Sequence, residues 1–243
     1  MQLGISPELT RELSPQRAKA LIGQLSAYVT VGKRTLIERS LNWRTRYLTV
    51  VLEDIYQSQN ASATIRTCDL LGVQDLHVIE GHNTFKINKA VTQGASKWVD
   101  IFRYGPDTGE PTQTCPGALR DKGYRLAALM PGANGFTPQT LPLDDPLALL
   151  FGNEETGLSP ELAGLADYTV GIPMFGFSRS YNLSVSVAIV LQSLTARLHD
   201  SSLHWRLAEE ELLRLKLRWY AKSAAKGEEL LRNLMANDPH AEK

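Results

Sequence analysis

Cysteine and histidine are scarce in this 243-residue chain. The two cysteines, Cys68 and Cys115, have no histidine at a spacing that suits a shared metal ion, and the five histidines are scattered. A structural zinc site needs four Cys or His ligands close together, and two cysteines cannot build a disulfide framework. We therefore expect a reduced protein without a metal centre.

Long hydrophobic runs are also missing. No apolar stretch reaches the roughly 20 residues that span a bilayer. The N-terminal residues carry charges early and lack the apolar segment of a signal peptide. Both absences predict a cytoplasmic protein that does not act in a membrane.

Glycine is absent from a turn where a large class of enzymes requires it. Residues 47–52 predict a first apolar strand, and the turn that follows, 53–60, reads EDIYQSQN. A dinucleotide-binding fold carries its glycine-rich fingerprint at this turn, and NTPases carry a P-loop pattern that this sequence lacks. The sequence therefore disfavours a nucleotide-dependent oxidoreductase or an NTPase.

Net charge is zero, with 26 basic and 26 acidic residues, but the two signs are unevenly placed. Residues 1–46 hold eight Lys or Arg and three Asp or Glu, whereas residues 47–199 hold ten and fifteen. A basic N-terminal arm on an acidic body is expected where the arm meets a polyanion. Charge alone equally allows a solvated, charged helix face.

The chain does contain a regular alternation of apolar strands and helices. Such an alternation predicts an α/β domain with a mainly parallel sheet and helices on both faces. The expected strands are 47–52, 75–80, 99–104, 124–130, 148–151 and 168–172, and the expected helices between them are 61–71, 86–94, 112–121, 159–166 and 183–199.

Three segments are expected along the chain. Residues 1–45 form a basic helical arm, in which Ser14-Pro15 is a typical helix start. Residues 46–199 form the α/β domain. Residues 200–243 form a C-terminal helical arm with amphipathic helices over 205–217 and 228–235.

Three motifs follow strands of the α/β domain: NASATIRT (60–67), LLFGNEETGLSPE (149–161) and IPMFGFSRSYNLSVSVA (172–188). In this order they resemble the signature motifs of the SpoU/TrmH family of SPOUT-class RNA 2′-O-methyltransferases. The resemblance covers roughly residues 47–199. The matched residues are Asn60, Ala63, Arg66, Thr67, Gly152, Glu154, Gly157, Ile172, Pro173, Met174, Ser180, Asn182 and Ser184.

This resemblance implies a C-terminal trefoil knot, a homodimer and S-adenosyl-L-methionine as the methyl donor, without a metal. Backbone groups of three loops would hold the donor. The residues implied are Ala128, Leu129, Gly152, Asn153, Ile172, Met174, Tyr181 and Leu183. Tyr181 departs from the family pattern, in which leucine is frequent, and its ring would alter the wall of the adenosine pocket or the dimer surface.

The resemblance also implies catalytic residues. In the family, the arginine that matches Arg66 activates the ribose hydroxyl, although an isolated arginine in a helix is usually a salt-bridged surface residue. A guanidinium is almost always protonated, so stabilising an alkoxide and acting as a base both stay open. Asn60 and Asn182 could orient Arg66 or the ribose, or cap helices. Glu154 could position the donor or Arg66, could accept N–H bonds from its own loop, or could be solvated; together with the other two motifs, a role in the site is favoured.

The resemblance implies a structured RNA substrate. Within the family, tRNA methylated at the D-loop guanosine of position 18 is favoured, because the N-terminal arm is short rather than a globular RNA-binding domain. Ribosomal RNA methylation and a catalytically silent RNA-binding paralogue are the alternatives. In the C-terminal arm, Trp219 or Tyr220 could stack on an unpaired base. Alternatively, Trp205, Leu213 and Leu217 dock this helix on the body of the protein, and for these residues docking is favoured.

Overall fold

The computed structural model describes residues 8–236 and divides the chain into two compact units. Unit 1 combines residues 1–44 with residues 206–243, and unit 2 spans residues 45–205. The two terminal arms, which the sequence analysis treated as separate segments, thus pack into a single helical unit.

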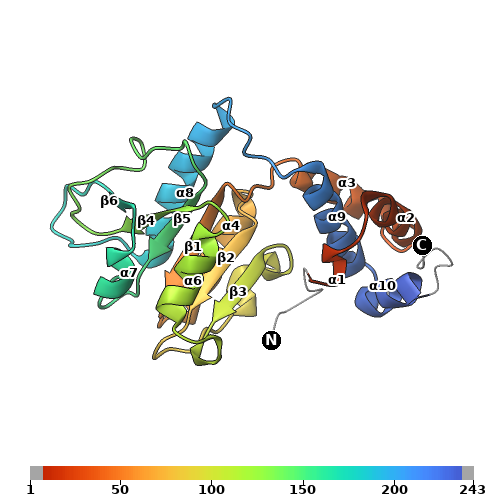
Figure 1. The fold of residues 1–243 in the computed structure, drawn as a ribbon, viewed down its shortest axis with the longest axis horizontal. Coiled ribbons are helices and arrows are strands. Elements are labelled where there is room, and N and C mark those ends of the chain that lie inside the picture. Colours follow the sequence, from red (N-terminus) through yellow and green to blue (C-terminus); the bar gives the residue numbers. More distant parts are fainter. Residues whose placement is uncertain (1–7, 237–243) are drawn as a thin grey trace. The chain divides into compact units, whose positions relative to one another are not determined.

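Unit 2 is built on a six-stranded sheet in the order β3-β2-β1-β5-β4-β6, and every pair of neighbours is parallel (Figure 1). All six expected strands are confirmed, with ends that differ by at most two residues. They are β1 (Leu48–Glu53), β2 (Asp75–Ile79), β3 (Asp100–Tyr104), β4 (Arg125–Leu129), β5 (Leu147–Phe151) and β6 (Tyr168–Val170).

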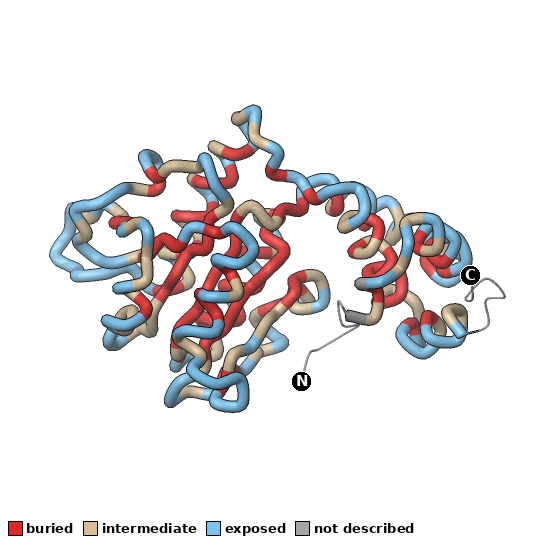
Figure 2. The backbone as a smooth tube through the Cα atoms, in the orientation of Figure 1, coloured by how far each residue is buried: buried red, intermediate tan, exposed pale blue. Residues whose placement is uncertain are grey.

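Helices cover both faces of this sheet, as expected for buried parallel strands. Alternate strand residues such as Val50 pack with α4 and α8, whereas Val51 packs with α6 and α7. The strands accordingly form the buried centre of the unit (Figure 2). The C-terminal knot stays a prediction. The helices are α4 (Ser58–Leu70), α5 (Lys89–Thr92), α6 (Pro111–Arg120), α7 (Pro160–Gly164) and α8 (Leu183–His199), with short η1 (Ala95–Lys97) and η2 (Pro106–Thr108).

Unit 1 is helical, and α9 packs against α2 and α3. The predicted start at Ser14-Pro15 is confirmed, because Ser14 Oγ accepts the Arg17 N–H at 3.3 Å and Pro15 is the first helical residue. The helices are α1 (Glu8–Arg11), α2 (Pro15–Ser26), α3 (Val31–Leu41), α9 (Glu209–Ser223) and α10 (Gly227–Ala236).

The expected helix over 205–217 begins later than the sequence suggested. Helix α9 starts at Glu209 with three glutamates in its first turn, where the helix dipole favours negative charge. Trp205 instead belongs to the core of unit 2, with its ring 4.6 Å from that of His199. Leu213 and Leu217 are buried within unit 1, where α9 packs against α2 and α3. Docking of this helix on the α/β body stays a prediction.

The expectation that Trp219 or Tyr220 stacks on a base is wrong. Their exposed fractions are only 2% and 4%. The Arg44 guanidinium lies over the Trp219 ring at 4.8 Å, and the Tyr220 hydroxyl donates to Glu38 Oε1 at 3.1 Å. Both rings therefore hold unit 1 together.

Within the described residues, no helix has the length and apolar character needed to cross a membrane.

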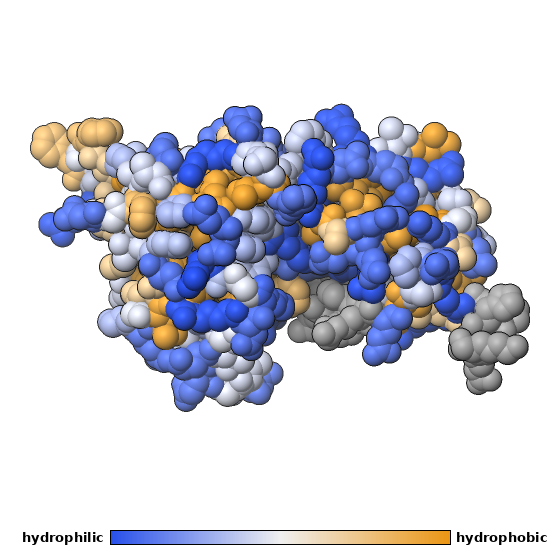
Figure 3. Space-filling view, turned by 45° about the horizontal axis from the view of Figure 1, so that its top comes forward, coloured by the Kyte–Doolittle hydropathy of each residue, from blue (hydrophilic) through white to orange (hydrophobic). Residues whose placement is uncertain are grey.

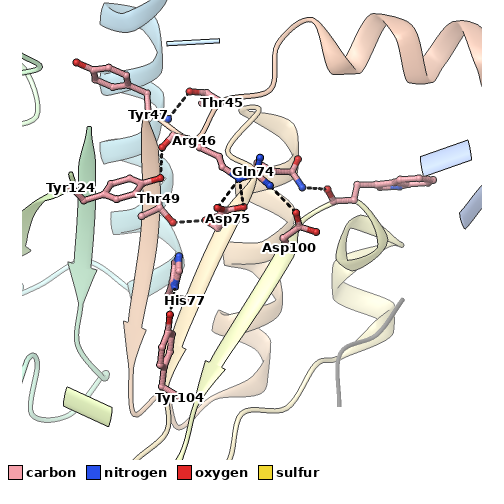
Figure 4. A network of polar contacts seen from close by, with 11 residues as sticks. Thr45, Arg46, Tyr47, Thr49, Gln74, Asp75, His77, Asp100, Tyr104 and Tyr124 are labelled. Carbon is pink, nitrogen blue, oxygen red and sulfur yellow. Dashed lines mark hydrogen bonds and ion pairs between the residues drawn. The ribbon is translucent and has the colours of Figure 1, made fainter. Parts of the chain in front are cut away.

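A buried polar network joins the first three strands (Figure 4). Arg46 donates to both carboxylate oxygens of Asp75, at 3.1 and 2.9 Å, and to Asp100 Oδ2 at 3.1 Å. Burial raises the pKa of Asp75 to about 6, against the opposing charge of Arg46. Further along β2, His77 Nδ1 lies 3.1 Å from the Tyr104 hydroxyl. Burial, followed by the charge of Lys122, lowers the pKa of His77 to about 3.

His77 is expected to make the fold sensitive to acid. Its pKa is about 3 in the folded chain against 6.5 when unfolded, so the unfolded chain binds this proton first as the pH falls. This contribution is fully present above pH 6.5 and is lost as the pH falls towards 3, by about 2 kcal/mol at pH 5. Urea unfolding should therefore show the free-energy gap between wild type and His77→Asn shrinking by that amount from pH 7 to pH 5.

Asp75, with its raised pKa, works in the opposite sense, but it is present in both proteins and drops out of the comparison. A gap independent of pH would contradict the assignment to His77.

Candidate active site

A cavity of about 290 Å³ opens at the carboxyl ends of β4, β5 and β6, the edge where α/β sheets bind ligands. Three chain segments surround it, and each follows one of these strands. The lining residues are Leu129, Met130, Pro131, Phe151, Gly152, Asn153, Glu154, Glu155, Thr156, Gly157, Val170, Ile172, Met174, Ser180, Tyr181, Leu183 and Ser186.

The loop after β5 closes on itself through Asn153. The Asn153 backbone exchanges N–H···O bonds with Gly157 at 3.2 and 3.1 Å. Its side-chain Oδ1 accepts the N–H groups of Glu155 and Thr156 at 3.0 and 2.7 Å. These bonds fix the loop without any ligand, so its backbone groups are already ordered along the cavity wall.

The two glycines of this loop are required by its geometry. A Cβ on Gly152 would lie only 1.9–2.1 Å from backbone atoms of Gly157 and Leu158, a separation that no real contact shows. Gly157 has φ +73°, a conformation that favours glycine. Both glycines of the second motif thus serve the fold of the loop.

A buried carboxylate, which the sequence analysis missed, holds the end of the same loop. Glu53 closes β1, and its two oxygens accept the Ser159 hydroxyl at 2.6 Å and the Ser159 N–H at 2.8 Å. Ser159 Oγ in turn caps α7 by accepting the Leu162 N–H at 3.1 Å. The available signal was an acidic residue directly after a buried apolar strand.

Three of the four expected catalytic residues form one hydrogen-bonded chain. Asn60 Nδ2 donates to Glu154 Oε1 at 2.5 Å, and Asn182 Nδ2 donates to Asn60 Oδ1 at 3.1 Å. Asn182 also caps α8, since its Oδ1 accepts the Ser184 N–H at 2.9 Å. Asn60 is not a cap, because α4 begins at Ser58. The chain links α4, the β5 loop and α8 beside the cavity.

One oxygen of Glu154 is left over. Oε1 takes the Asn60 bond, whereas Oε2 is buried and has no hydrogen-bond partner among the described residues. An unpaired buried acceptor is costly, so this oxygen is available to a donor group of a ligand or substrate.

Arg66, the fourth expected catalytic residue, is not part of the hydrogen-bonded network formed by Asn60, Glu154 and Asn182. Its side chain is exposed, does not line the cavity, and has no hydrogen-bond or ion-pair partner in the part of the chain that the structure describes. It follows Asn60 by six residues, about 9 Å along the helix. Arg66 is therefore the free cation of the catalytic set.

Seven of the eight residues expected to hold the donor line the cavity; Ala128 does not, because it is buried inside β4 and pairs with Leu150. Tyr181 lines the cavity and stays partly exposed. Across residues 8–236 there is no group of three or more His, Cys, Asp or Glu that could hold a metal ion.

A family model described as the SpoU rRNA Methylase family matches residues 47–192. The chain belongs to this family. The resemblance inferred from the three motifs is confirmed, and the matched span contains β1 to β6 and the whole cavity lining.

Relatives within the SpoU family are similar over most of their length. The tRNA (guanosine(18)-2′-O)-methyltransferase of Borreliella burgdorferi is 44% identical over 214 residues, which cover 88% of this chain and 95% of the relative. The protein of the same name from Thermus thermophilus is 35% identical over 178 residues, 70% of this chain and 88% of its own.

Solved structures of RNA-modifying enzymes share the fold. The TrmH/SpoU tRNA modifying enzyme of Aquifex aeolicus superimposes with a TM-score of 0.69 at 28% identity, over 79% of this chain and 96% of that one. An rRNA methyltransferase from Sinorhizobium meliloti, described as AdoMet bound, gives 0.55 at 25% identity, over 66% and 60%.

Proposed function

We propose that this chain transfers a methyl group from S-adenosylmethionine to the ribose 2′-oxygen of guanosine 18 in the D-loop of tRNA. The observation that carries the proposal is the cavity lined by the second and third motifs and tied to the first through Asn60. The names and the extent of similarity of the Borreliella and Thermus relatives support the substrate. A tRNA substrate implies that the enzyme works in the cytoplasm.

The cavity suits the methyl donor in its chemistry. Leu129, Ile172 and Leu183 supply apolar walls for an adenosine, and the ordered loop at Asn153 supplies backbone groups. Glu154 Oε2, which has no partner among the described residues, can accept a hydrogen bond from a hydroxyl of S-adenosylmethionine or of the RNA ribose. When bound, S-adenosylmethionine supplies the electrophilic methyl group.

Arg66 is assigned to the acceptor. Methyl transfer forms an O–C bond at the ribose as the C–S bond of the donor breaks, and the hydroxyl proton is released to solvent. A cation close to the oxygen stabilises the charge that develops there. A guanidinium that is exposed and has no ion-pair partner among residues 8–236 can meet an incoming RNA without first breaking such a pair. We assign Asn60 and Asn182 the task of holding Glu154 and the start of α8 in register.

Unit 1 is assigned to RNA affinity. It carries fifteen Lys or Arg and ten Asp or Glu, a net charge of +5, whereas unit 2 carries eleven and sixteen, a net charge of −5. Cations that replace condensed counterions along RNA supply sequence-independent affinity.

We also propose a homodimer formed through the loop between β6 and α8. Phe175 and Phe177 in this loop are fully exposed, and Val185 at the start of α8 is also exposed. The loop lies at the left edge of unit 2 in Figure 1, and hydrophobic side chains protrude at that edge in Figure 3. Apolar patches of this kind mark protein interfaces, and a symmetric pair is the commonest assembly.

Replacing both Phe175 and Phe177 with serine should convert the dimer to a monomer at micromolar concentration, as measured by sedimentation. Leu70→Ser is the matched control, because Leu70 is an exposed hydrophobic residue of unit 2 that lies on α4, outside this loop. A wild type that sediments only as a monomer would refute the dimer, and a double variant that stays dimeric would refute this interface.

A further inference from the structure

The segment between β2 and β3 is basic although unit 2 is acidic. Residues 81–99 contain three lysines and no Asp or Glu. The rest of unit 2 has eight Lys or Arg and sixteen Asp or Glu, a net charge of −8. Such a body repels RNA, so a segment of it whose charged residues are all basic is a place where the RNA backbone can approach.

The basic segment is fixed to the same edge of the sheet at which the cavity opens. Just after β1, Asp54 Oδ1 accepts the Asn83 N–H at 2.7 Å, and just after β2, Glu80 Oε1 accepts the Phe85 N–H at 2.7 Å. Both carboxylates are thus engaged by the backbone of the segment, and neither pairs with one of its lysines in the described structure.

A third bond joins the segment to α4, the helix that carries Asn60 and Arg66. The Asn88 N–H donates to Ser62 Oγ of α4 at 2.8 Å. Ser62 and Arg66 are four residues apart, so they lie on the same face of this helix one turn from each other. The residues that flank Asn88, including Lys86 and Lys89, are therefore anchored on the face of α4 that bears Arg66.

Lys86 and Lys89 are both exposed, and neither has an ion-pair partner among residues 8–236. We propose that they bind backbone phosphates of the RNA next to the acceptor ribose and so deliver its 2′-oxygen to Arg66. Every ribose lies between two phosphates, and contacts to phosphate set register without reading the base. The inference rests on the proposed function and extends it to specific positioning residues outside the three motifs.

The test compares wild type with the Lys86→Ala/Lys89→Ala double variant in binding of an unmodified tRNA transcript at 50 to 200 mM salt. Log affinity falls as log salt rises, and each lost phosphate contact makes this fall less steep by about 0.7–0.9 in the slope. Two lost contacts reduce the steepness by about 1.6. The factor by which the double variant binds more weakly than wild type should therefore be about ninefold larger at 50 mM than at 200 mM salt. Affinity for S-adenosylmethionine, measured by calorimetry, should stay unchanged.

Two controls separate a phosphate contact from a structural effect. The Lys86→Arg/Lys89→Arg variant should retain the wild-type salt slope, and so should Lys122→Ala, which removes one exposed cation from the turn after α6. An unchanged salt slope in the alanine double variant would overturn the proposal. A double variant whose oligomeric state changes while its RNA affinity does not would overturn it as well. A wild type that binds and methylates no tRNA would instead contradict the proposed function itself.

Discussion

Replacing Arg66 with alanine is expected to slow methyl transfer by a factor on the order of 10²–10³ while leaving affinity for the methyl donor near that of wild type. The reason is the position of the side chain. Arg66 does not line the cavity and is not part of the Asn60–Glu154–Asn182 chain, so its removal leaves the donor site intact. Single-turnover kinetics and calorimetry would measure the two quantities separately.

Arg66→Lys refines this test. Lysine keeps the charge but loses the planar, forked geometry of the guanidinium, so it should recover only part of the lost rate. A collapse of donor affinity in Arg66→Ala, in step with the rate, would contradict the assignment to the acceptor and make Arg66 a structural or donor-binding residue.

Replacing Gly152 with alanine should weaken binding of the methyl donor, which Arg66→Ala leaves unchanged. The added Cβ would overlap the backbone of Gly157 and Leu158, so the loop after β5 could not keep its closed form. Overpacking against backbone costs up to about 3 kcal/mol, which corresponds to about a hundredfold loss of affinity if the cost falls on the donor-binding form. Calorimetry with S-adenosylmethionine would measure it.

Gly164→Ala is the matched control, because a Cβ at Gly164 meets no atom within 4 Å. It should bind the donor as wild type does. A Gly152→Ala protein that folds and binds the donor normally would show that this loop can be rebuilt without loss, and that the cavity in its observed form is not needed for binding.

The sheet could be predicted because its strands are buried on both faces. Parallel strands of this kind appear as short apolar runs between turn residues, and 48–52 and 147–151 are such runs. The helical unit could be predicted only in part. Amphipathic spacing showed that α9 docks, but not which side its aromatic residues face, and Trp219 and Tyr220 prove to be buried against Arg44 and Glu38.

The candidate site divides in the same way. Motif spacing marked the loops that line the cavity, because each follows a strand and strand ends meet at one edge. Long-range bonds could not be anticipated. The Glu53–Ser159 pair joins residues 106 positions apart, and the Ser62–Asn88 bond fixes the basic segment on α4. No local pattern indicates either pairing.

The position of the transferred methyl group tests the proposed function most directly. Purified protein would be incubated with labelled S-adenosylmethionine and unmodified tRNA, with a ribosomal RNA transcript in parallel, and the product mapped by nuclease digestion and mass spectrometry. We expect a 2′-O-methyl group on guanosine 18 of the tRNA, and no transfer when that nucleotide carries a 2′-deoxyribose. Methylation at another position, methylation of the ribosomal transcript alone, or no transfer at all would contradict it.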